Sequence, residues 1–92
     1  MMKNDQTDKT PPKVQPWKDN PKTIEFETKA KNLLRGEMRR KGITTAQLAE
    51  KLGAMGIQET ERNLNNKISR GGFTGAFLLQ CLEAIGVTEV RL

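Results

Sequence analysis

The chain has no histidine and no tyrosine, and its 92 residues include a single cysteine, Cys81. One thiol cannot form an internal disulfide, and the usual zinc ligand sets need histidine or several cysteines. No serine or threonine sits in a glycine-rich elbow, and neither a Walker loop nor a GxGxxG motif is present. We therefore predict a protein that is not an enzyme, with no catalytic residues, no metal and no cofactor.

Long apolar runs are also missing, since the longest covers residues 76–79. A membrane span needs about 20 apolar residues, and no secretory signal of the usual form is present. We expect a soluble, cytoplasmic protein with no membrane-embedded part. Sixteen lysines and arginines against eleven acidic residues give a net charge of +5, which suits a polyanion or an acidic membrane surface without selecting between them.

All four prolines lie within the first 21 residues, where large apolar side chains are scarce. Such a segment cannot bury enough apolar surface to offset the entropy lost on ordering. We predict a disordered basic tail over residues 1–22 and a folded domain over residues 23–92. Two interpretations of the tail stay open: a solubilising leader, or a basic arm that touches DNA with Trp17 as an anchor.

Within residues 23–92 the apolar residues recur at helical spacing, which predicts four helices. The first begins between Ile24 and Thr28 and ends at Lys41, before Gly42. A second begins at the capping-box sequence TTAQ (44–47), with Met55 as a candidate for its inner face. The third runs from residue 59 or 60 to 70, and the last opens near residue 73 and ends at 86.

Cys81 falls on the apolar face of the last expected helix, next to Phe77 and Leu82 in the helical pattern. We interpret it as a buried structural thiol, because no basic residue stands near it in sequence. The closing segment 87–92 is too short to assign, and its apolar residues Val87, Val90 and Leu92 can cap the core or add an edge strand.

The third expected helix has an unusual polar face. At 100° per residue, its outward arc collects Glu59, Arg62, Asn63, Asn66, Ser69 and Arg70. Asparagine is a poor helix former, so three asparagines at 63, 65 and 66 suggest a gain elsewhere. In the major groove an asparagine amide pairs with the adenine edge, and an arginine guanidinium with the guanine edge. The alternative is that the asparagines are tolerated in a short helix held by Leu64 and Ile68.

The order of elements resembles the phage-repressor and Cro-like helix-turn-helix domains over about residues 28–87. The resemblance is strongest in GITTAQLA (42–49) and ISRG (68–71). The block ETERNLNNKISRGGF (59–73) is similar to a family of short bacterial domains whose function is unassigned.

The resemblance implies an all-α fold, a small four- or five-helix bundle with a helix-turn-helix. Residues 45–52 would be the supporting helix, and residues 59–70 the recognition helix in the major groove. Carried over by position, the base contacts would come from Arg62, Asn63 and Asn66. The phosphate contacts would come from Thr45, Gln47, Lys67 and Arg70.

The sequence departs from the repressor-like pattern in two places. An arginine of the first helix commonly pairs there with a glutamate of the recognition helix, whereas the aligned positions here are Met38 and Ser69. Loss of one partner alone would leave the other as an unpaired buried charge, so it is physically consistent that both are absent. We predict that Met38 packs against the third helix. The connector GAMGIQ (53–58) is longer than the family's tight turn, which leaves the angle between the two helices open.

These features favour sequence-specific binding of double-stranded DNA by a dimeric transcriptional regulator. One recognition helix buries too little surface for strong specificity, so we expect a homodimer, with Leu79 and the C-terminal segment as candidate contacts. The alternative is a protein-interaction module on the same scaffold, such as an antitoxin or accessory factor, since residues 23–92 carry a net charge of just +3. Single-stranded RNA binding ranks last, because Phe73 and Phe77 are assigned to the core.

Overall fold

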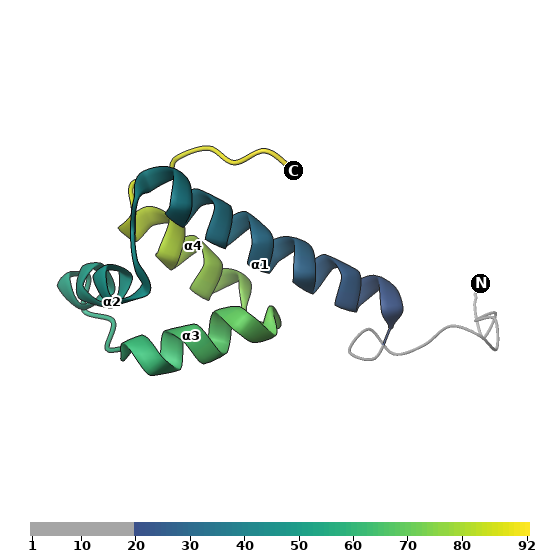
Figure 1. Cartoon of the computed structure of the whole chain (residues 1–92), viewed down its shortest axis with the longest axis horizontal. Helices are drawn as coiled ribbons and strands as arrows, with labels where there is room; N and C mark the ends of the chain where they lie inside the picture. Colours follow the sequence, from purple (N-terminus) through teal and green to yellow (C-terminus); the bar gives the residue numbers. More distant parts are fainter. Residues whose placement is uncertain (1–19) are drawn as a thin grey trace, which may run out of the picture.

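A computed structural model describes residues 20–92, which form four helices and no strand. The helices are α1 (Pro21–Lys41), α2 (Thr45–Ala54), α3 (Glu61–Arg70) and α4 (Gly75–Ala84). α1 and α2 each pack against both α3 and α4 (Figure 1). The predicted all-α fold of four or five helices is confirmed, with four helices in the described residues. Residues 1–19 of the predicted tail lie outside the described residues.

α1 begins at Pro21, three residues before the earliest expected start, so Pro21 and Lys22 belong to the helix and not to the tail. Proline is well suited to the first helical position, because its missing N–H would have had no partner in the helix and its φ is already helical. Asn20 caps the helix, since its Oδ1 accepts a hydrogen bond of 2.8 Å from the Lys22 N–H. Within the described chain, no helix has both the length and the apolar character that crossing a bilayer requires.

The other helix ends follow the local capping chemistry. α1 ends at Lys41 as predicted, and Gly42 adopts the left-handed conformation with φ 70°. The capping box of α2 is confirmed, because Thr44 Oγ1 accepts from the Gln47 N–H at 3.1 Å and Gln47 Oε1 accepts from the Thr44 N–H at 2.8 Å. α3 begins at Glu61, slightly later than expected, with Thr60 as its cap.

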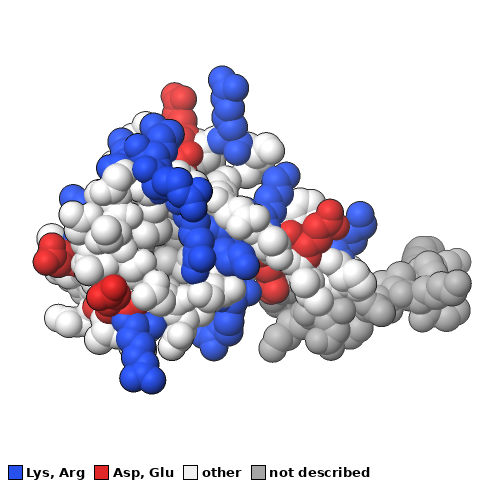
Figure 2. Space-filling model, in the orientation of Figure 1, with Lys and Arg blue, Asp and Glu red and all other residues white. Residues whose placement is uncertain are grey.

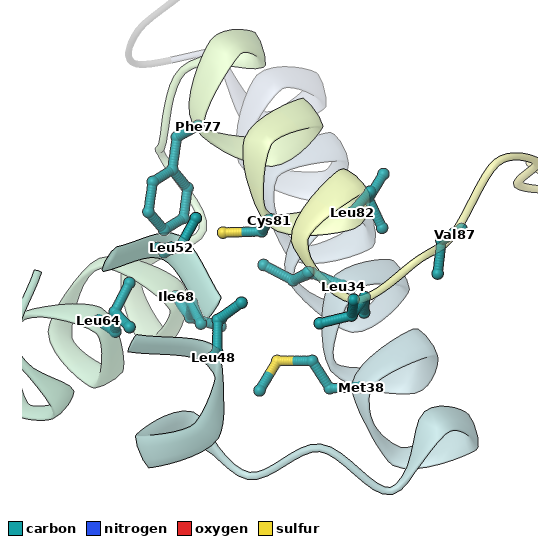
Figure 3. Packing of buried hydrophobic residues seen from close by; sticks show 11 residues of the cluster. Leu34, Met38, Leu48, Leu52, Leu64, Ile68, Phe77, Cys81, Leu82 and Val87 are labelled. Carbon is teal, nitrogen blue, oxygen red and sulfur yellow. The ribbon is translucent and has the colours of Figure 1, made fainter. Parts of the chain in front are cut away.

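The hydrophobic core is drawn from all four helices and from the segment after α4 (Figure 3). Its buried residues are Leu34, Met38, Leu48, Leu52, Leu64, Ile68, Phe77, Cys81, Leu82, Ile85 and Val87. Met55 is not among them and was placed wrongly, because α2 ends at Ala54 and Met55 occupies the exposed C-cap. After α4, Val87 covers the core, whereas Val90 and Leu92 are exposed and join no strand within residues 20–92.

The end of α3 is fitted closely against α1. Gly71 follows α3 with φ 75°, and its backbone is buried. A Cβ placed on Gly71 would lie 2.6 Å from the carbonyl oxygen of Glu27 in α1. This approach fixes the C-terminal end of α3 relative to the long helix.

Candidate functional site

α3 is a short helix anchored along one narrow stripe. Leu64 is fully buried and Ile68 is 1% exposed, one turn apart. Thr60 Oγ1 accepts a hydrogen bond of 3.0 Å from the Asn63 N–H and satisfies one of the free donors at the helix start. The two anchors and the cap hold α3 in place, while most of its other residues are exposed.

The three predicted base-contacting residues all lie on this outward surface. Arg62, Asn63 and Asn66 are exposed. Within residues 20–92, none of their side chains takes part in a hydrogen bond or ion pair. Their amide and guanidinium groups are therefore available to a partner outside the domain.

The predicted phosphate contacts are in more varied surroundings. Arg70 is exposed at the last turn of α3, and Thr45 is half-buried at the first turn of α2. The carboxamide oxygen of Gln47 is occupied by the Thr44 N–H. Lys67 is half-buried, and its Nζ lies 2.5 Å from Glu59 Oε2 and 5.2 Å from the centroid of the Phe77 ring. Gln47 and Lys67 thus already serve contacts inside the domain.

A contact that the sequence analysis missed joins α1 to α3. Arg35 Nη2 donates a hydrogen bond of 3.0 Å to Ser69 Oγ. Met38, three residues further along α1, is 6% exposed and belongs to the same buried cluster as Leu64 and Ile68 of α3, in agreement with the prediction that it packs against this helix. The arginine that reaches α3 is therefore one turn earlier than the aligned position, and it meets a hydroxyl instead of a carboxylate.

The same two helices border a groove of about 530 Å³, whose wall also includes the start of α2. Its lining residues are Arg35, Met38, Arg39, Ile43, Thr44, Thr45, Glu61, Asn65 and Ile68. Figure 2 shows basic side chains in a band that runs from the C-terminal end of α1 towards α3. The groove lining therefore combines apolar side chains with two guanidinium groups and one carboxylate.

Cys81 belongs to the hydrophobic core and does not line this groove. It is fully buried, and burial raises its pKa from 9.0 to about 12, with Glu59 adding to the rise and Lys67 opposing it. A thiol that stays protonated at neutral pH is a poor nucleophile. The interpretation of Cys81 as a structural thiol agrees with its burial.

A family model described as a domain of unknown function, DUF6471, matches residues 26–90. The chain belongs to the DUF6471 family. The matched range contains α2, α3, α4 and the part of α1 that borders the groove, so the exposed face of α3 lies inside the DUF6471 domain. This agrees with the resemblance of residues 59–73 to short domains of unassigned function. No curated protein and no solved structure matches the chain.

Proposed function

We propose that this DUF6471 protein is a cytoplasmic, dimeric transcriptional regulator that binds double-stranded DNA with sequence specificity. In this proposal α2 and α3 act as a helix-turn-helix of the phage-repressor type, and α3 enters the major groove. The observation that carries it is the outward placement of Arg62, Asn63 and Asn66 on a helix held by buried residues on its other side.

The chemistry of these side chains suits base edges. An asparagine amide donates and accepts at once and so matches adenine, while arginine presents two parallel donors to guanine. Asn63 and Asn66 are three residues apart, and Arg62 and Asn66 four, so all three occupy neighbouring positions on one helix face. A well-formed bidentate pair discriminates against the wrong base by about 1–3 kcal/mol.

Contacts to phosphates fix the position of a recognition helix on DNA. The residues proposed for these contacts differ in whether their polar groups are free to bind a phosphate. Arg70 is exposed one turn beyond Asn66, and Thr45 stands at the start of α2. Lys67 and Gln47 would contribute mainly by keeping α3 and α2 in place, since their polar ends are held by Glu59 and Thr44. We therefore rank Arg70 and Thr45 above Lys67 and Gln47 as backbone contacts.

The test is a selection of bound sequences from random double-stranded DNA at physiological salt, followed by affinity measurements on the selected site. Asn63→Ala and Asn66→Ala are each expected to weaken binding to that site by about 5- to 150-fold, the equivalent of 1–3 kcal/mol, with a much smaller effect on unrelated DNA. Asn32→Ala is the matched control, because Asn32 is an exposed asparagine of α1 that is not among the residues lining the groove between α1 and α3. Unchanged affinity and preference in both α3 variants would refute the proposal.

A protein-interaction module is the second candidate, and the exposed leucine of α4 favours it. Leu79 is 67% exposed and borders a surface groove of about 460 Å³ together with Val87 and Val90. In the first proposal this surface forms the homodimer, and in the second it receives a different protein, as an antitoxin or accessory factor would.

Two measurements separate these candidates. Sedimentation of the wild type and of Leu79→Glu is expected to give a dimer and a monomer, respectively, if the surface joins two copies. A monomeric wild type from which the selection recovers no preferred DNA site favours the interaction module. Salt titration adds a second distinction, because displacement of phosphate counterions makes DNA affinity fall steeply with salt, whereas an apolar protein contact is far less sensitive.

A further inference from the structure

The groove between α1 and α3 is lined by two arginines that form no ion pair with any carboxylate of residues 20–92. Arg35 and Arg39 are exposed and stand one helical turn apart on α1, about 6 Å along its axis. Some other basic residues of the domain do have acidic partners, since Arg40 pairs with Glu37 and Lys67 with Glu59. In residues 20–92, no carboxylate lies within 4 Å of either Arg35 or Arg39.

Arg35 is also oriented by the neighbouring helix. One of its terminal nitrogens donates to Ser69 Oγ at 3.0 Å, which directs the guanidinium towards the last turn of α3. A guanidinium has five N–H donors, so this single bond leaves most of its donors for a further acceptor. The serine hydroxyl carries no charge and therefore does not lower the attraction of Arg35 for an anion.

The two arginines lie beside the face of α3 that contacts the DNA bases in our proposal. Asn65 and Ile68 of α3 line the groove from one side, and the two arginines line it from the other. The basic band in Figure 2 continues from this end of α1 to α3. A strand of DNA lying against α3 would therefore bring its phosphates to the mouth of the groove.

We propose that Arg35 and Arg39 each bind a phosphodiester group of the DNA backbone beside α3, with Ser69 as the positioning residue for Arg35. This inference rests on the proposed DNA-binding function and adds α1 to the binding surface. Guanidinium groups are suited to phosphate because their paired donors match two oxygens of one group. The contact sets the register of α3 on the duplex and carries no sequence information itself.

Glu61 is the one acidic residue in the groove lining and acts against this contact. It stands at the first position of α3, where a carboxylate stabilises the helix end. Its charge would repel an approaching phosphate. Glu61→Gln is therefore expected to tighten DNA binding while slightly lowering the stability of the domain.

The experiment measures the affinity for the selected DNA at several salt concentrations. Each phosphate contact contributes about 0.9 to the slope of log K against log salt on double-stranded DNA. Arg35→Gln and Arg39→Gln are each expected to lower that slope by about 0.9, and to weaken selected and unrelated DNA alike. The matched control is Arg40→Gln, which removes the same charge from the same helix but from an arginine already paired with Glu37.

Ser69→Ala tests the positioning role. It is expected to weaken binding less than Arg35→Gln does, and to have no further effect in the Arg35→Gln variant, while Ser69→Thr retains the hydroxyl and the affinity. Thermal unfolding of each variant checks that the exposed substitutions leave the domain folded.

The possible failures are distinguishable. Loss of the Asn63 and Asn66 effects on the selected site would overturn the proposed function together with this inference. If those effects stand but Arg35→Gln, Arg39→Gln and Arg40→Gln all share the wild-type salt slope, the arginine contact is refuted and the proposed function is not. An additive effect of Ser69→Ala in the Arg35→Gln variant would overturn the positioning role.

Discussion

Replacing Gly71 by alanine tests how firmly α3 is fixed to α1. Gly71 has φ 75°, a left-handed conformation that costs a residue with a Cβ about 1–2 kcal/mol. The added Cβ would also lie 2.6 Å from the Glu27 carbonyl oxygen, a backbone atom that cannot rotate away. Overpacking of this kind costs a further amount of about 1–3 kcal/mol. We expect Gly71→Ala to lower the free energy of unfolding by about 2–5 kcal/mol.

Gly42 supplies the matched control. It has φ 70°, close to that of Gly71, but a Cβ placed there would have no atom within 4 Å. Gly42→Ala therefore carries the conformational cost alone, about 1–2 kcal/mol. Gly36 lies inside α1 in equally open space, and alanine there is expected to stabilise the domain by up to about 1 kcal/mol.

Urea unfolding followed by circular dichroism measures these differences, and melting temperatures should move by about 4–8 °C per kcal/mol for a domain of this size. The decisive quantity is the difference between Gly71→Ala and Gly42→Ala, because it isolates the contact between the end of α3 and α1. If the two substitutions lower the free energy of unfolding equally, the end of α3 does not make this close contact with α1, and the prediction is wrong.

Three further tests concern individual contacts of the domain. Because the pKa of Cys81 is raised from 9.0 to about 12, the thiol is protonated in the folded state and ionised in the unfolded state between these values. The contribution of this thiol to the free energy of unfolding should therefore be fully present below pH 9.0 and be lost as the pH rises through about 12. Urea titrations across this pH window check the loss. The Cys81→Ala variant should lose less stability over the same window. Glu59→Gln and Lys67→Met should show a coupling of about 1 kcal/mol or less in a double-mutant cycle, since the lysine side chain is 42% exposed and solvent screens the pair. Thr44→Ala removes the capping box of α2 and should cost about 1 kcal/mol in the same unfolding assay.

Most helix ends could be predicted because their signals are local. Gly42 and the pair Thr44 and Gln47 act within a few residues of each other, so the sequence alone specifies their geometry. The start of α1 was misplaced because Pro21 was counted with the proline-rich tail, although proline also favours the first turn of a helix. Met55 was misplaced because a helical wheel assumes that the helix continues, and α2 ends one residue earlier.

The sequence predicts which residues of α3 face outward, but it does not predict which of its side chains contact other elements. Helical periodicity places Asn63 and Asn66 outward without reference to the rest of the chain. It does not say which long side chains reach across to another element. Arg35 and Ser69 are 34 residues apart, and Lys67 meets Glu59 and Phe77 from two different segments. Such pairings depend on how the helices are placed, and long flexible side chains can satisfy them in several ways.

α3 depends on its surroundings more than the other helices do, because its three asparagines give it a low intrinsic helix propensity. The groups that hold it are its cap Thr60, its anchors Leu64 and Ile68, and the Gly71 turn against α1. None of these is a proposed base contact, and none of the side chains proposed to contact bases takes part in holding the helix. Stability and recognition are therefore assigned to different residues. Substitutions of Arg62, Asn63 or Asn66 should change DNA affinity with little change in unfolding free energy, whereas substitutions of the anchors should lower stability first and binding only as a consequence.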